Sequence, residues 1–471
     1  MSQLPPGSRL PALVQSVHAA RDPLGSVRRL RRAHGPIFTR RLISEAPQVV
    51  VADVAAARQV FADPTGAGLV GCPRKRLFES VVGEHSLFTM DGPAWERHHR
   101  LLAPALQGRA IEAWRDTIAE ITDREIAGWP AHRAFPLHRA MRRIALEVIV
   151  RLVWGARLPE RRGRLRVLAP RMLDRLSLAA LVMPPRVRDR VLTANGFTDL
   201  RERLDEVLFA EITDRRRQHG SKSGGARGQH GSESGNGRRQ HGSKRGSGSG
   251  DGDGDGDGDG DGDGDMLSRL VGEEEDDQAV RDEMVTLLLA GHETTAAGLA
   301  WAFERLLRTP RVWERLRDEP EDEEFLQAVV RETLRIRPVA LTGHRRLVAP
   351  MEILGYEIPA GCSVLPMIRL IHQDPAVFPD PAAFRPDRFL GDEAGPAMRA
   401  WLPFGHGARY CVGARLAMLT MRTVISRVAA STDLAAPDPR PESQQLRQVT
   451  VTPGSGTRAV ARPRRREPLF T

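Results

Sequence analysis

Long apolar runs and cysteines are scarce in this chain of 471 residues. No apolar run approaches the roughly 18 residues that a membrane span requires, so we expect a soluble protein without a membrane span. The three cysteines, Cys72, Cys362 and Cys411, form no even set, which excludes a small disulfide scaffold and favours a reducing, cytoplasmic setting. The first ten residues contain proline and no apolar signal core, so no targeting segment is expected.

Aromatic residues are also few. The net charge is +10, from 70 Lys and Arg against 60 Asp and Glu, and the aromatic content helps to decide which partner this charge would attract. Such a charge can attract nucleic acid or an acidic partner. Two tyrosines in the whole chain, and no basic segment interleaved with stacking rings, argue against nucleic acid. Between Arg215 and Asp265 nine basic residues balance nine acidic ones, so the positive excess lies in the rest of the chain.

One internal segment, Gln218–Asp265, cannot bury a core. Its 48 residues include no large apolar side chain and hold 18 of the 44 glycines. In its first half the tetrapeptide Gln-His-Gly-Ser recurs every 11 residues, and in its second half Asp and Gly alternate. The carboxylates of the second half could bind calcium weakly. No acidic residue closes that array as a calcium loop requires, so disorder is the favoured interpretation. We predict one folded domain in two parts, 1–217 and 266–471, separated by a disordered Gly/Ser/Asp-rich insert at 218–265.

The apolar pattern outside the insert predicts a mainly α protein with small β-sheets. Apolar residues spaced three and four apart predict several helices between Ala94 and Leu208. Asp277–Arg308 predicts a helix of some thirty residues that is apolar almost all round, so it must run through the centre. The other expected elements are a strand at Val49–Ala52, a helix from about Val54 to Val60, helices up to Arg337, strand-like pieces to about Pro366, and a helix from Val412 to about Ala430.

The strongest chemical motif is the ten-residue segment Phe404–Gly413. Two glycines permit a tight turn before Cys411, and a helix follows, so helix-terminal amides could stabilise a thiolate. Gly413 removes a side chain where a flat ligand could approach, and Arg409 supplies a donor fork for a carboxylate. For a lone cysteine, a buried core residue in a glycine-rich turn would be the better interpretation.

The spacing of Phe404, Gly407, Arg409, Cys411 and Gly413 changes that balance, because it resembles the haem-binding loop of the cytochrome P450 family. The resemblance covers nearly the whole chain apart from the insert. It implies the P450 fold, with a long central helix over the haem, and haem b as the cofactor. It also implies that Cys411 is the axial ligand of the iron and that Phe404, Arg409 and Gly413 bind the haem.

A second motif, Glu332-Thr333-Leu334-Arg335, supports the resemblance. It places a carboxylate and a guanidinium three residues apart on one helix face, which alone would be a surface contact worth under about 1 kcal/mol. In the resembled family this pair begins a buried triad with an arginine that corresponds here to Arg388. The triad is structural, so we do not count it as catalytic.

A third motif, Ala290–Thr295, lies inside the long apolar helix. Its glutamate and hydroxyls cost free energy there unless they are paired, and a threonine can return its hydroxyl to the preceding turn. The segment is similar to the oxygen-activating groove of the P450 family, with Gly291 leaving room, Glu293 as the acid and Thr294 as the hydroxyl beside bound oxygen. The resemblance implies that Glu293 and Thr294 are the catalytic residues and deliver protons.

Basic residues elsewhere are candidates for the haem carboxylates. Trp95 begins a segment that resembles the tryptophan helix of the family, but the position four residues later, usually arginine, is His99, whose charge depends on pH. Either His99 or the neighbouring Arg100 would bind a propionate. Arg345 matches a further haem-binding arginine, with Arg346 as the competing register. For each of these basic residues, the alternative to binding the haem is a side chain that only faces solvent.

The resemblance implies an enzyme, a monooxygenase that inserts one oxygen atom of O2 into an organic substrate. Electrons would come ultimately from NAD(P)H, through a separate ferredoxin and ferredoxin reductase, since no flavin or ferredoxin segment is visible. An acidic ferredoxin would meet basic residues on the cysteine side. The alternatives are a peroxide-driven enzyme of the same fold, which would not need Glu293 and Thr294, and a non-catalytic haem-binding sensor or ligand carrier.

The substrate is expected to be apolar and of medium size, because the candidate pocket walls are mostly apolar. These walls are Leu77–Met90, Leu176–Met183, Leu287–Ala297 and Val339–Gly343.

Overall fold

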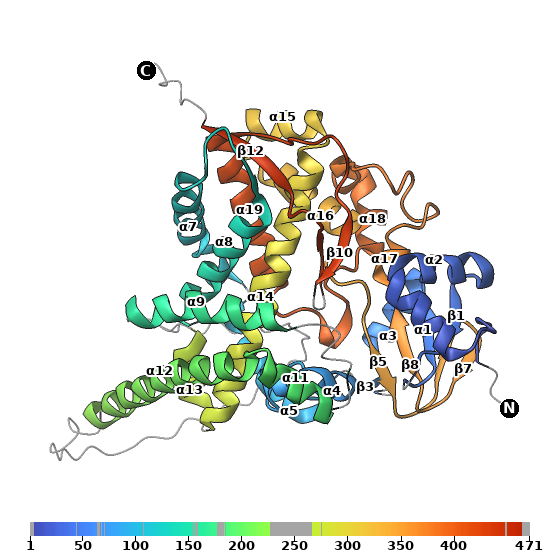
Figure 1. Cartoon of the computed structure of the whole chain (residues 1–471), viewed down its shortest axis with the longest axis horizontal. Helices are drawn as coiled ribbons and strands as arrows, with labels where there is room; N and C mark the ends of the chain where they lie inside the picture. Colours follow the sequence, from blue (N-terminus) through green and yellow to red (C-terminus); the bar gives the residue numbers. More distant parts are fainter. Residues whose placement is uncertain are drawn as a thin grey trace, which may run out of the picture.

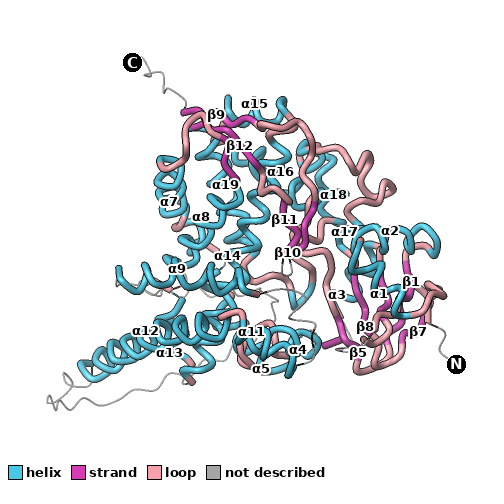
Figure 2. The backbone as a smooth tube through the Cα atoms, in the orientation of Figure 1, coloured by secondary structure: helices cyan, strands magenta, loops and turns pink. Residues whose placement is uncertain are grey.

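The computed structural model describes residues 4–226 and 266–463, except for 44, 64–65, 67, 70, 107, 153, 156–158, 177–182, 184, 275 and 448–449. Helices fill most of the molecule, and a smaller lobe that contains the N-terminal helices and most of the strands lies to one side (Figure 1). Figure 2 shows the same division by secondary structure. The predicted class, mainly α with small β-sheets, is confirmed.

The largest sheet joins strands from both ends of the chain. Its order is β1-β2-β8-β5-β3, and only the β2–β8 pair is parallel, with Val49 opposite Val364. Both of these valines are fully buried, so β2, one residue before the predicted strand, anchors the lobe. The five strands are β1 (Ile37–Arg40), β2 (Gln48–Val51), β3 (Gly68–Leu69), β5 (Arg345–Leu347) and β8 (Ser363–Pro366).

The remaining strands form one small sheet and two hairpins. A three-stranded sheet has the order β4-β12-β9, and β6 pairs with β7 and β10 with β11. These strands are β4 (Ala134–Pro136), β6 (Met351–Ile353), β7 (Tyr356–Ile358), β9 (Thr432–Ala435), β10 (Gln444–Arg447), β11 (Thr450–Pro453) and β12 (Arg458–Pro463).

The predicted central helix is α14 (Asp277–Leu306), which begins after Asp276, whose side chain accepts from the backbone N–H of Gln278. From Ala279 onward its residues are buried except at four positions, so this helix runs through the core as its apolar composition requires. The partly exposed positions are Ala290, Gly291, Thr294 and Arg305.

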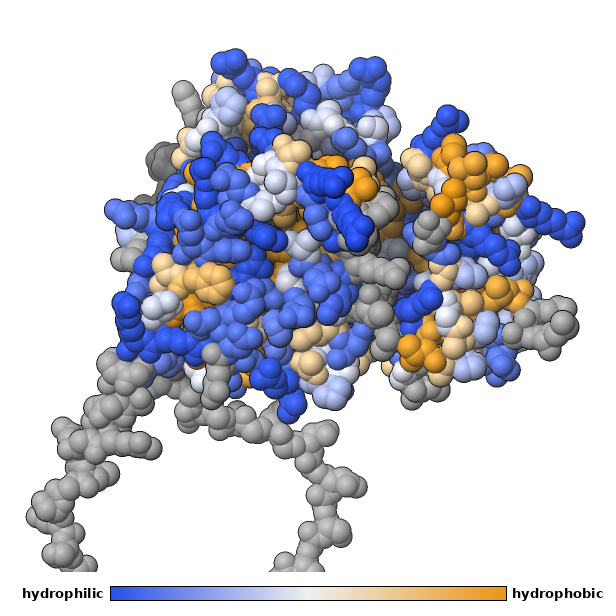
Figure 3. Space-filling view, turned by 60° about the horizontal axis from the view of Figure 1, so that its bottom comes forward, coloured by the Kyte–Doolittle hydropathy of each residue, from blue (hydrophilic) through white to orange (hydrophobic). Residues whose placement is uncertain are grey.

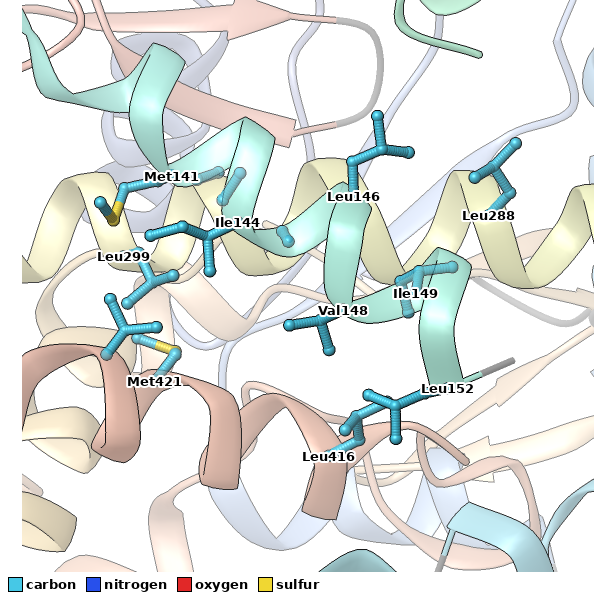
Figure 4. Close-up of a cluster of buried hydrophobic side chains, with 14 of the residues drawn as sticks. Met141, Ile144, Leu146, Val148, Ile149, Leu152, Leu288, Leu299, Leu416 and Met421 are labelled. Carbon is cyan, nitrogen blue, oxygen red and sulfur yellow. The ribbon is translucent and has the colours of Figure 1, made fainter. Parts of the chain in front are cut away.

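Several helices pack on α14. Its most extensive contact is with α8 (Leu137–Leu152), and it also contacts α19 (Ala414–Ser431) and α16 (Glu323–Ile336). Figure 4 shows α8, with Ile144 and Ile149, crossing in front of α14, and Leu416 and Met421 of α19 below the crossing. A Cβ at Gly298 would lie 3.1 Å from the sulfur of Met421, so a glycine there permits the close approach of α19.

The other helices cover this core. They are α1 (Ala12–Arg21), α2 (Pro23–His34), α3 (Val54–Ala62), α4 (Gly71–Val82), α5 (Gly92–Leu102), η1 (Pro104–Leu106), α6 (Arg109–Glu112), α7 (Arg115–Ala127), α9 (Pro159–Arg175), α11 (Pro185–Ala194), α12 (Phe197–Ala226), α13 (Met266–Glu273), α15 (Pro310–Asp318), α17 (Ile368–Ile371), η2 (Pro386–Phe389), η3 (Gly391–Glu393), α18 (Ala394–Ala400) and η4 (Gly407–Arg409). None of the described helices is both long enough and apolar enough to cross a membrane.

The structure corrects the start of the predicted insert. Helix α12 continues to Ala226, nine residues past the expected boundary at Arg217. The start of this extension contacts α13: Arg216 donates to the carbonyl of Val271 at 3.2 Å, and His219 packs beside Gly272. Residues 227–265, including the Asp-Gly alternation, lie outside the described residues, and their predicted disorder stays a prediction.

Candidate active site

The segment around Cys411 forms a tight turn immediately before α19. Gly405 and Gly407 have φ of 77° and 70°, which a residue with a side chain rarely adopts. The backbone N–H of Cys411 donates to the carbonyl of Phe404 at 3.0 Å, and that of Ala414, the first residue of α19, donates to the carbonyl of Cys411 at 3.2 Å. The Cys411 side chain is exposed at this turn, not buried as the core-cysteine alternative requires.

Gly407 and Gly413 have different surroundings. A Cβ at Gly407 would lie 2.6 Å from the carbonyl oxygen of Phe61, so this glycine lets the turn rest on α3. A Cβ at Gly413 would meet no atom within 4 Å, so the structure leaves space beside the cysteine on that side. The ring of Phe404 packs against Trp401, with ring centroids 5.7 Å apart.

Arg409 joins the cysteine turn to α5. One nitrogen, Nη2, donates to the carbonyl of Met90 at 3.0 Å and to Asp91 Oδ1 at 2.7 Å. The guanidinium carbon lies 4.0 Å from the centroid of the Trp95 ring, and Trp95 stacks on His99 with centroids 4.7 Å apart. Partial burial, together with the charge of Arg409, lowers the pKa of His99. Arg409, Trp95 and His99 therefore form one cluster.

Arg100 does not join that cluster. Its side chain is exposed, and within the described ranges it donates to one group alone, the backbone carbonyl of Glu96, at 3.4 Å. Of the two residues that the sequence left open for a haem carboxylate, the structure therefore places His99, rather than Arg100, beside Arg409.

Arg345 approaches the cysteine turn through an aromatic ring. It is 3% exposed on β5, and its guanidinium carbon lies 5.4 Å from the centroid of Phe61. The same ring would lie 3.9 Å from a Cβ at Gly405. Because successive residues of a strand point to opposite faces, Arg346 is directed away from this contact.

The Ala290–Thr295 motif presents two different faces of α14. Ala290, Gly291 and Thr294, spaced one and three apart, form the only strip in the middle of the helix that is not buried. The hydroxyl of Thr294 donates to the carbonyl of Ala290 at 2.5 Å, as expected for a threonine inside a helix. A Cβ at Gly291 would lie 2.4 Å from Ile149 Cδ1. This corrects the expectation that Gly291 leaves room for a ligand, because the space is filled by α8.

Glu293 lies on the other face of the helix, buried between two arginines. Its Oε2 is 2.9 Å from Arg142 Nε and its Oε1 is 3.5 Å from Arg447 Nε. Both arginines also contact Asp174 on α9. His138 lies 3.9 Å from Glu293, and burial lowers its pKa to about 4, so it is neutral near pH 7. The positive charge opposite Glu293 therefore comes from the arginines.

A cavity of about 730 Å³ adjoins these arginines, and its walls include His138, Arg142, Asp174 and Arg447. The sequence did not identify the partners of Glu293, which are His138, Arg142 and Arg447. All three lie about 150 residues from Glu293 along the chain, so no local pattern could have identified them.

The predicted triad is present and fully buried. Glu332 accepts from Arg335 through both oxygens, at 2.6 and 2.8 Å, and from Arg388 Nε at 3.1 Å. Glu332 and Arg335 are 0% exposed. This confirms the expected structural role, since the triad ties α16 to η2.

The residues around the cysteine turn fit a haem. An exposed thiol, open space at Gly413, a cluster of Arg409 and His99, and a partly open strip on α14 supply an iron ligand, a face for a flat ring, and cationic or hydrogen-bonding partners for carboxylates. Of the candidate pocket walls, residues 177–182 lie outside the described residues.

Comparisons with known proteins agree with this geometry. The family model described as Cytochrome P450 matches residues 4–223 and 263–456, and leaves 224–262, within the predicted insert, unmatched. A Mycobacterium tuberculosis protein named cytochrome P450 135B1 is 33% identical over 98% of this chain and 91% of its own length. Another named cytochrome P450 138, from Mycobacterium bovis, is 33% identical over 98% and 97%.

Solved structures show the same fold. The retinoic acid-bound cyanobacterial CYP120A1 has a TM-score of 0.76 at 21% identity, over 98% of this chain and 100% of that one. CYP175A1 from Thermus thermophilus has a TM-score of 0.73 at 23% identity, with the same coverage.

Proposed function

The chain belongs to the cytochrome P450 family and is a haem-thiolate monooxygenase, and on that premise we propose which residues act, which substrate class it takes and which partner reduces it. The cofactors are haem iron, with O2 and NAD(P)H-derived electrons. One observation carries the residue assignment: the exposed Cys411 lies at a turn that also contains open Gly413 and the Arg409 cluster.

We propose that Cys411 is the thiolate that would bind the haem iron. When bound, haem supplies the oxygen-activating redox chemistry. Arg409 and His99 would hold the haem carboxylates, with Trp95 positioning both, and Arg345 would act from the β5 side. Gly413 leaves the approach to Cys411 open for a flat ring, and Phe404 packs beside the turn.

Thr294 and Glu293 are proposed to handle protons. The hydroxyl of Thr294 lies on the partly open strip of α14 and can pass a proton from Oγ1 to the reacting oxygen. Glu293 is the nearest acid along the helix and could restore that proton after its carboxylate leaves the arginine pair. Arg142 and Arg447 are therefore positioning residues, which hold the Glu293 carboxylate.

An apolar substrate is supported by the described parts of the candidate walls. Leu87, Met90, Leu287 and Val339 are apolar and 7–9% exposed. Apolar walls of this kind bind a ligand mainly through the burial of apolar surface.

A separate acidic ferredoxin is the proposed electron donor. Arg415, one turn beyond Cys411 on α19, is exposed. Arg58 lies near the same turn, since its charge, after burial, contributes to lowering the pKa of His406. Opposite charge at the cysteine side would steer an acidic partner. Arg415→Glu should raise the KM for the ferredoxin without changing the haem spectrum, whereas Arg311→Glu on α15 should change neither.

The first experiment is the absorption spectrum of the dithionite-reduced protein under carbon monoxide. We expect a strongly red-shifted Soret band that Cys411→Ser abolishes. Cys362, 4% exposed, offers the matched control, and Cys362→Ser should leave the band unchanged. A parental band that persists in a haem-loaded Cys411→Ser protein would contradict the ligand assignment.

The second experiment measures product formed per NAD(P)H consumed. Thr294→Val should uncouple the two, and Glu293→Gln should slow turnover by about 10² to 10⁴ if it supplies the proton. Thr294→Ser keeps the hydroxyl and should remain coupled. A non-catalytic haem sensor would not need Thr294, so its haem and ligand binding would be unchanged in Thr294→Val and no product would form in any variant.

A further inference from the structure

Helix α1 exposes apolar side chains and buries a polar one, the reverse of an ordinary surface helix. Leu10, just before the helix, and Leu13 and Val17 within it are 48%, 61% and 39% exposed. Their spacing of three and four places them on one side. The residue that α1 turns inward is polar: Gln15 is 7% exposed and donates to the carbonyl of Leu10 at 2.7 Å.

The loop after β1 extends this apolar surface. Gln15 accepts from the backbone N–H of Arg41 at 3.1 Å, and Ser16 accepts from that of Ile43 at 2.9 Å, so residues 41–43 lie against α1. Ile43 is itself 48% exposed. Four of the ten exposed large apolar side chains among the described residues thus come from this one region: Leu10, Leu13, Val17 and Ile43, the α1 patch. Figure 3 shows orange surface gathered on the same lobe, among blue side chains.

Positive charge is concentrated in the same part of the chain. Residues 1–41 contain eight Arg and one Asp, a balance of 8 − 1 = +7, out of +10 for all 471 residues. Three exposed arginines adjoin the patch: Arg9 precedes Leu10, Arg21 lies one turn after Val17, and Arg41 is bonded to Gln15 through its backbone. Among the described residues, none of these three forms a salt bridge.

We propose that the α1 patch docks on an anionic lipid surface as a peripheral, reversible contact. An aliphatic stripe ringed by arginines is the composition of helices that lie in the interface of anionic bilayers, where the apolar side chains enter the acyl boundary and the guanidinium groups meet phosphates. A protein-binding hot spot would more often contain Trp or Tyr, and the patch has no aromatic side chain. The docking needs neither haem nor turnover, so it stands independently of the proposed function.

The test is co-sedimentation of the full-length, haem-loaded protein with vesicles of phosphatidylglycerol or phosphatidylcholine. We expect binding to phosphatidylglycerol alone, and release in molar salt, where the Debye length falls to about 3 Å. Leu13→Gln with Val17→Gln should weaken the partition coefficient at least about tenfold, because glutamine forms helix well but does not enter the acyl region. Arg9→Gln with Arg21→Gln should remove much of the salt dependence.

The matched control is Val167→Gln with Val187→Gln, which changes two valines that are 46% and 45% exposed on α9 and α11. This variant should bind vesicles as the parent does. The proposal is overturned if the parent stays in the supernatant with phosphatidylglycerol, or if Leu13→Gln with Val17→Gln binds vesicles as well as the control variant does. It is also overturned if Leu13→Gln with Val17→Gln only converts a dimer into a monomer in sedimentation velocity, which would identify a second copy of the chain as the occupant.

Discussion

Neutralising Glu332 should destabilise the protein more than any surface charge change. Its carboxylate is 0% exposed and faces Arg335 and Arg388, so Glu332→Gln leaves two buried guanidinium groups without a counter-charge. The same oxygen that meets Arg388 also accepts from the backbone N–H of Arg385, at 2.8 Å. Breaking a buried ion pair by removing one partner typically costs about 3 to 5 kcal/mol.

That cost is a large part of the stability of a domain, which is about 5 to 15 kcal/mol. With about 2 °C lost per kcal/mol in a large domain, Tm should fall by about 6 to 10 °C. Haem content should fall as well. Arg335 donates to the carbonyl of His372 at 2.8 Å, and the His372 ring accepts from the backbone N–H of Leu402, close to the cysteine turn.

The assay is thermal unfolding followed by circular dichroism, with the ratio of Soret to protein absorbance as the measure of haem content. Glu393→Gln is the control, because Glu393 is 67% exposed and lies 3.8 Å from Arg385. It should change stability by less than about 0.5 kcal/mol. Equal Tm values for the two variants would refute the argument that the buried triad holds the fold together.

Two further predictions concern the cysteine turn, and a third concerns the buried His372. Gly407→Ala should lower both stability and haem content, because the new Cβ would lie 2.6 Å from the carbonyl oxygen of Phe61 at a φ of 70°; unfolding and Soret intensity check this. Gly413→Val should leave the stability of the haem-free protein nearly unchanged but weaken haem binding, because a Cβ there meets no protein atom; a haem titration measures it. Burial, and then the charge of Arg335, lowers the pKa of His372 to about 3, so the unfolded chain binds the proton first and the free energy of unfolding should fall as pH decreases from about 6.5 towards 3. His372→Gln, which keeps an acceptor for Leu402, should reduce this slope in urea titrations at several pH values, and an unchanged slope would contradict the assignment.

Short-range patterns in the sequence were sufficient for much of the fold and part of the site. The buried α14 follows from an apolar composition all round the helix. The cysteine turn lies within ten consecutive residues, and Glu332 and Arg335 are three apart on one helix, so local spacing alone juxtaposes them. Strand β2 begins and ends one residue before the predicted strand, and α19 begins at Ala414, two residues after the predicted start.

Contacts between distant segments were decided only by the tertiary structure. The partners of Glu293 are Arg142 and Arg447, from α8 and β10, and no periodicity relates residues so far apart. Packing also directed His99, rather than its neighbour Arg100, towards Arg409, because adjacent residues on a helix point in different directions. The sequence by itself therefore determined the cysteine turn and the residue proposed as the iron ligand, whereas the packing of helices and strands decided which charges surround the candidate site residues. The physical reason is that a turn or a helix is set by neighbouring residues, while an ion pair across the core exists only after the elements have docked.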